Sequence, residues 1–193
     1  MGLAILILGL ALLLGGHTFV TFRAQRAALV TRLGESTYKA VFTVIALVGL
    51  VLIVWGFARY RAAGPIDIWY PPPWTRHVTV ALTWPAIVLI VAAYSRGRIY
   101  AALKHPFLAG VKLWAVAHLI SNGDLGSVIL FGSVLAWSVY DRISLKRRSD
   151  PGAPGIPVGG ARNDAIAVVG GTLLYLVLGF LHPQFIGVPA FSR

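Results

Sequence analysis

The sequence predicts an all-α fold, a polytopic bundle of about six transmembrane helices. Of its 193 residues, 58% are hydrophobic and only 12% are charged, whereas soluble domains carry about 25% charged residues. Long apolar runs separated by short polar gaps follow one another along the chain. A water-soluble fold could not bury that much apolar surface, so we expect an integral membrane protein with one domain over residues 1–193.

Six apolar runs mark the expected helices. They cover residues 2–22, 38–57, 77–94, 106–120, 125–140 and 165–181. Each approaches the roughly 20 residues that cross a bilayer as a helix, although the fourth and fifth are short. The first run lacks a basic leading segment and a good cleavage site, so we interpret it as a retained helix and not a signal peptide.

The positions of the basic residues predict the orientation. Twelve Lys and Arg residues belong to the first, third and fifth gaps when Lys39, at the start of the second run, is counted with the first gap, and four lie in the other gaps and the tail. Because cytoplasmic loops collect Lys and Arg, we expect the odd gaps inside and both termini outside. This topology explains the net charge of +11 better than nucleic-acid binding, which we do not expect. The Gly, Pro and charge content of residues 141–163 predicts a flexible cytoplasmic loop.

Histidines inside the apolar runs are the main candidates for chemistry, since ionisable groups within a bilayer are costly and usually face the bundle or a cavity. His17 lies in the first run, where Ala11 and Gly15 have a spacing that permits close helix packing. His17 either bonds the backbone of a neighbouring helix or ligates haem iron against the adjacent glycines. His118 carries similar alternatives: an interhelical hydrogen bond, or ligation of a metal or haem.

The fourth and fifth runs hold further polar groups. His105 precedes Pro106, so it lies near the N-terminal cap of the fourth helix, as a cap or as a site residue. Lys112 either snorkels, pairs with an aspartate from elsewhere or holds an anionic group such as a haem propionate. Asn122 favours a left-handed helix cap, and Asp124 either caps the next helix or acts near a cavity. Polar groups on two faces of the fourth helix predict that other helices surround it.

Absent residues and motifs exclude several chemistries. The chain has no cysteine, which excludes disulfides, thiolate metal sites, iron–sulfur clusters and covalently attached haem. It also lacks the Walker A, dinucleotide-binding, zinc-protease and nucleophile-elbow motifs. Nucleotide and hydrolase chemistry of the soluble type is therefore not expected.

Five segments spread over nearly the whole chain form a recognisable set: "GHTF", "LGESTYKAVFTVIALVGLVLIVWGF", "IWYPPPWTRH", "KHPFLAGVKLWAVAHLISNGDLGSVILFGS" and "LYLVLGFLHPQFIGV". With these segments the chain resembles the NnrU family of bacterial membrane proteins. Lys104 stands where the family usually has arginine before His-Pro. The resemblance implies a bacterial inner-membrane protein linked to denitrification, in nitrite and nitric oxide reduction. Its role would be redox sensing, isomerase-like chemistry or accessory work for a respiratory reductase.

Two further resemblances concern the cofactor. The sequence is similar to the 15-cis-zeta-carotene isomerases, which are haem b proteins. That similarity implies haem b with His17 and His118 as iron ligands, and with His105 in the motif without being a ligand. The chain also resembles membrane methyltransferases of the isoprenylcysteine type, which use an Arg-His-Pro motif. Their segment for S-adenosylmethionine, with paired glutamates and tyrosines, is missing here, so this is the least favoured alternative.

Overall fold

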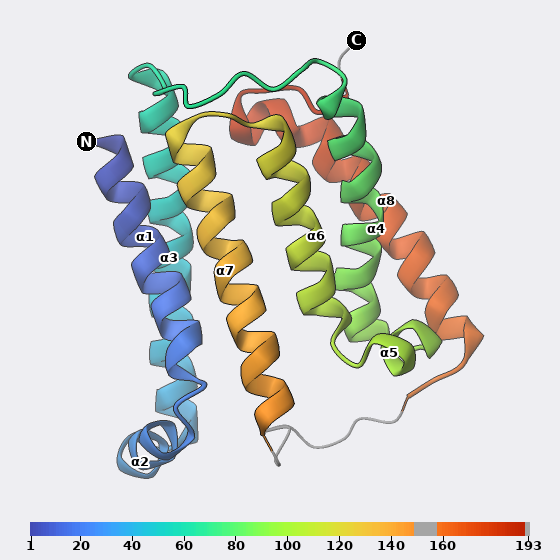
Figure 1. The fold of residues 1–193 in the computed structure, drawn as a ribbon. Helices are drawn as coiled ribbons and strands as arrows, with labels where there is room; N and C mark the ends of the chain where they lie inside the picture. The colour runs from blue at the N-terminus through green and yellow to red at the C-terminus, as the bar shows by residue number, and fades with distance from the viewer. Residues whose placement is uncertain (149–157, 192–193) are drawn as a thin grey trace. The chain divides into compact units, whose positions relative to one another are not determined.

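The computed structural model describes residues 1–148 and 158–191 and confirms the all-α fold. Five of its helices are long and apolar enough to cross a membrane (Figure 1). They are α1 (Gly2–Phe19), α3 (Glu35–Ala62), α4 (Thr75–Ser95), α7 (Leu125–Arg147) and α8 (Ala161–Ile186). The apolar helix α6 (Pro106–Ser121) has only 16 residues. The chain is therefore a polytopic helical membrane protein, and the outward position of its termini stays a prediction.

Several helix ends differ from the sequence prediction. The chain turns after Phe19, and the separate helix α2 (Arg23–Leu33) follows, while α5 (Arg98–Leu103) precedes α6. An apolar run in the sequence marks the part of a helix that lies in lipid. The helix itself can continue past that part, because its backbone hydrogen bonds also form between polar residues. For that reason α7 extends to Arg147 and α8 begins at Ala161, inside the predicted flexible loop. The remainder of that loop falls mainly on residues 149–157, which lie outside the described residues.

The chain divides into two compact units. The first contains residues 1–69 and 124–137, and the second contains residues 70–123 and 138–193. Helix α7 contributes to both units. His17 belongs to the first unit and His118 to the second.

Glycines bring α1 and α3 into backbone contact in the first unit. A Cβ added at Gly9 would lie 2.7 Å from the carbonyl oxygen of Gly49, and one at Gly56 would lie 2.4 Å from the backbone nitrogen of Leu6. Such close approach is possible only where no side chain intervenes. Buried side chains complete this core: Leu6, Leu10, Ile53, Phe57 and Tyr60.

The small residues predicted to make this contact do not make it. Ala11 and Gly15 are exposed, and nothing lies within 4 Å of a Cβ added at Gly15. Gly2 and Gly9, seven residues apart on another face of α1, pack against α3 instead. A helix has several small-residue pairs, and the partner helix decides which pair is buried.

In the second unit α4 packs against both α6 and α8. The Thr79 hydroxyl donates to the Ala117 carbonyl of α6 at 2.7 Å, and the Tyr175 hydroxyl of α8 donates to the Val80 carbonyl at 3.1 Å. In α6 only Phe107 is exposed. Helix α4 is the long helix that packs against α6 in this unit, and the expectation that other helices surround α6 stays a prediction.

Candidate functional site

His17 is half-buried in the first unit and is bonded to its own helix. Its Nδ1–H donates to the Leu13 carbonyl over 2.7 Å, so the predicted bond to a neighbouring helix's backbone is wrong. Only a protonated nitrogen can bond a carbonyl, and Nε2 of a neutral ring therefore carries the lone pair. The ring of Phe42 from α3 lies 5.2 Å away, and that of Trp137 from α7 lies 5.6 Å away, edge-on.

Two buried polar groups in this aromatic cluster have no hydrogen-bond partner among the described residues. They are the indole N–H of Trp137 and the hydroxyl of Tyr38, a residue that is only 7% exposed and stacks on Phe42. A buried donor without an acceptor costs about 1–3 kcal/mol. A bound group that accepts hydrogen bonds would remove that cost, so the cluster around His17 is a candidate binding site.

The sequence interpretation did not include Tyr38, Phe42 or Trp137. For Tyr38 and Trp137 the signal was a polar aromatic side chain near the end of an apolar run, and Phe42 gave no signal of its own. Residues 42 and 137 come from different helices, and no spacing along the chain relates them to His17.

His118 in the second unit shows the same bond as His17. Its Nδ1–H donates to the Trp114 carbonyl over 2.8 Å, and the two rings lie 4.8 Å apart. The backbone N–H and side-chain amide of Asn122 both donate to the His118 carbonyl, at 3.0 and 2.8 Å. The left-handed cap predicted at Asn122 is wrong, since its φ is −126° and its ψ is 115°. The amide and the backbone N–H of Asn122 thus cap the His118 carbonyl without a left-handed residue.

Asp124 caps α7, as the sequence predicts. Its carboxylate accepts from the backbone N–H of Ser127 at 3.0 Å and from the Ser127 hydroxyl at 2.6 Å. Nearby, the Leu125 N–H donates to the Ile66 carbonyl, and the Ile66 N–H donates to the Tyr60 hydroxyl. These contacts join the start of α7 to the end of α3 within the first unit.

His105 occupies the cap position of α6, and Pro106 is the first helical residue and is fully buried. Lys104 before them has a positive φ of 61°, which side chains rarely adopt. Burial lowers the pKa of His105 below its ordinary value, and the charge of Arg142 lowers it further, while Asp141 opposes the shift. Folding therefore favours the neutral imidazole of His105.

Lys112 is half-buried in α6, and no ion pair within the described part of the chain includes it. Within residues 1–148 and 158–191, no three His, Asp or Glu side chains lie together where they could hold a metal ion.

A comparison with family profiles resolves the identity of the chain. The profile described as NnrU protein matches residues 5–190. The chain belongs to the NnrU family. No significant match was found among curated proteins or among solved structures. Membership covers both compact units and confirms the resemblance seen in the sequence, whereas haem binding stays a prediction.

Proposed function

We propose that this NnrU family protein supports denitrification, in nitrite and nitric oxide reduction, as a membrane protein that binds haem b through His17 and His118. One observation carries the proposal. In both histidines the Nδ1–H donates to the carbonyl four residues earlier in the same helix. Histidines that ligate metals usually hold the other ring N–H on a carbonyl or carboxylate, which fixes the tautomer and makes Nε2 the coordinating atom.

The surroundings of His17 support the proposal, because the ring lies among the aromatic side chains of Phe42 and Trp137. The Trp137 indole N–H supplies a donor without an acceptor among the described residues. In the other unit, Trp114 adds an aromatic face beside His118.

The chain's own residues would position and shield the cofactor. Each histidine would offer Nε2 of a neutral ring to an iron, with its rotamer fixed by the backbone bond, and the apolar helices would limit access of water. When bound, haem b supplies one-electron redox chemistry and an iron that takes small ligands, which suits a redox sensor in nitrogen-oxide respiration.

The test is an absorption spectrum of protein purified in detergent from haem-replete cells. We expect a Soret band and about one haem per chain by pyridine haemochrome assay. His17→Ala and His118→Ala should each lower the haem content or change the spectrum, whereas His77→Ala, at an exposed histidine of α4, should do neither. Because the two ligand candidates belong to different units, each is replaced separately.

A colourless wild-type protein would contradict haem binding. A His17→Ala/His118→Ala protein that lacks haem, still supports nitrite reduction in cells and co-purifies with a reductase subunit would instead favour an accessory or assembly role.

A further inference from the structure

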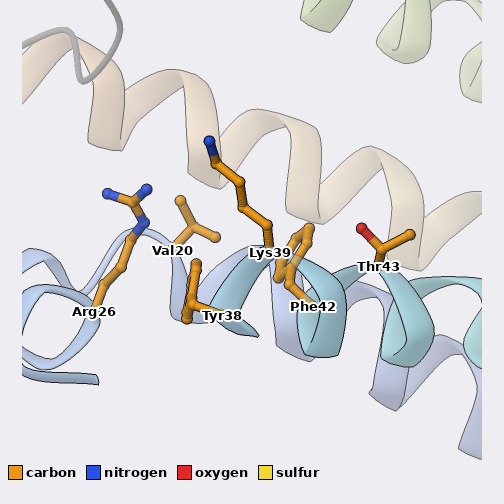
Figure 2. Close-up of a pocket in the computed structure, with 6 residues that line it drawn as sticks. All are labelled: Val20, Arg26, Tyr38, Lys39, Phe42 and Thr43. Atoms are coloured by element: carbon orange, nitrogen blue, oxygen red, sulfur yellow. The ribbon is translucent and has the colours of Figure 1, made fainter. Parts of the chain in front are cut away.

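An open groove in the first unit combines positive charge with aromatic side chains. It has a volume of about 310 Å³ and is lined by Val20, Arg26, Tyr38, Lys39, Phe42 and Thr43 (Figure 2). These residues come from the turn after α1, from α2 and from the first turns of α3. The groove therefore lies at one end of the α1–α3 pair.

Two cations share the rim of the groove. Figure 2 shows the side chains of Arg26 and Lys39 extending to the same side. The Arg26 guanidinium lies 5.5 Å from the centre of the Tyr38 ring. Lys39 Nζ lies 2.6 Å from a carboxylate oxygen of Glu35, in a pair whose side chains are 67% and 71% exposed. Because exposed ion pairs are weak, Glu35 leaves Lys39 available to a stronger anion and the rim keeps a net positive charge.

The aromatic wall of the groove offers an unused hydrogen-bond donor. Tyr38 lines the groove, is 7% exposed, and its buried hydroxyl has no partner among the described residues. Phe42 stacks on Tyr38, with ring centres 6.4 Å apart. A ligand with acceptor oxygens would satisfy the hydroxyl and receive the two cations.

Around the groove, a basic helix lies next to an exposed apolar helix face, which is the arrangement expected where a protein meets the surface of a membrane. Helix α2 carries three arginines and no acidic residue, and Figure 1 shows it end-on, lying across the ends of α1 and α3. Beyond the groove α3 exposes an apolar face, including Val41, Val44 and Val48 at 46%, 59% and 46%. Charge at one end and an apolar face beyond it match an amphiphile with an anionic headgroup.

We propose that this groove binds the phosphate headgroup of an anionic phospholipid from the leaflet on the α2 side. Arg26 and Lys39 contact the phosphate, the Tyr38 hydroxyl donates to a headgroup or ester oxygen, and the acyl chains follow the apolar face of α3. A soluble phosphate ester shares the headgroup chemistry but would leave that apolar face unused.

The experiment is a lipid titration of the full-length, delipidated protein followed by native mass spectrometry. Phosphatidylglycerol should bind more tightly than phosphatidylcholine or glycerol 3-phosphate. Arg26→Gln/Lys39→Gln should weaken phosphatidylglycerol binding about tenfold, because each cation near the surface contributes to attraction of anionic lipid. Lys146→Gln/Arg147→Gln removes the same charge from exposed positions at the end of α7 and should leave the affinity unchanged. Tyr38→Phe should weaken binding about threefold, the cost of one hydrogen bond.

Glu35→Gln is a second test that leaves the groove lining intact. It frees Lys39 from its ion pair and should tighten phosphatidylglycerol binding about threefold, whereas Asp67→Asn, at an exposed acid elsewhere in the unit, should not. Equal losses in the two double variants would overturn the groove site, because binding would then follow net charge alone. Glycerol 3-phosphate binding as tightly as the lipid would overturn the assignment to a phospholipid.

Discussion

The contact between α1 and α3 predicts a measurable cost for one added methyl group at Gly56. A Cβ there would lie 2.4 Å from the Leu6 backbone nitrogen and 2.9 Å from the Leu6 Cα and the Ile5 carbonyl carbon. All three neighbours are backbone atoms, so no rotamer change can relieve the overlap. Ordinary contact begins at 3.4 Å, and the helices would therefore have to separate by about 1 Å in an interface that is closely packed.

The size of the effect follows from two opposing terms. Overpacking a close contact costs about 1–3 kcal/mol, and replacing glycine by alanine in a helix gains about 1 kcal/mol. Gly15→Ala should show only the gain in helix stability, because nothing lies within 4 Å of its added Cβ and no overpacking occurs. The difference between the two variants isolates the packing cost. For a chain of this size each kcal/mol changes the melting temperature by about 2–4 °C.

Thermal unfolding in detergent, followed by circular dichroism at one scan rate, measures this difference. We expect Gly56→Ala to melt several degrees below Gly15→Ala. If Gly56→Ala melts at or above the temperature of Gly15→Ala, the direct backbone contact between α1 and α3 is wrong.

Three further predictions concern the caps and turns. Asp124→Ala removes both bonds to Ser127 and should lower the free energy of unfolding by about 1–2 kcal/mol; an unchanged melting temperature would contradict the cap. Lys104→Gly should raise stability by about 1 kcal/mol, because glycine adopts the φ of 61° without strain, and a lower melting temperature would argue against that backbone conformation. His105 has a lowered pKa, so the unfolded chain binds the proton more readily and stability should fall as the pH drops through the ordinary histidine value. Melting curves of His105→Gln should show a smaller loss at acid pH, and an identical pH dependence would contradict the shift.

The fold class follows from composition and run length because a bilayer leaves few alternatives. Backbone groups in lipid must be hydrogen-bonded internally, so an apolar run long enough to cross becomes a helix. Local patterns also predict the caps at His105 and Asp124, since each depends on residues within one turn. The pattern at Asn122 leads to the wrong cap because a side-chain amide and a left-handed backbone satisfy the same carbonyls.

The sequence by itself determined that this is a helical membrane protein with histidines inside its apolar segments. Tertiary structure alone decided which glycines join α1 and α3, since Gly9 and Gly49 lie forty residues apart and several other small residues share their spacing. It likewise brought Phe42 and Trp137 beside His17 from two other helices. The physical reason is that the shape of the partner helix determines which face of a helix is buried. The residues near that face in the sequence do not show which partner it has.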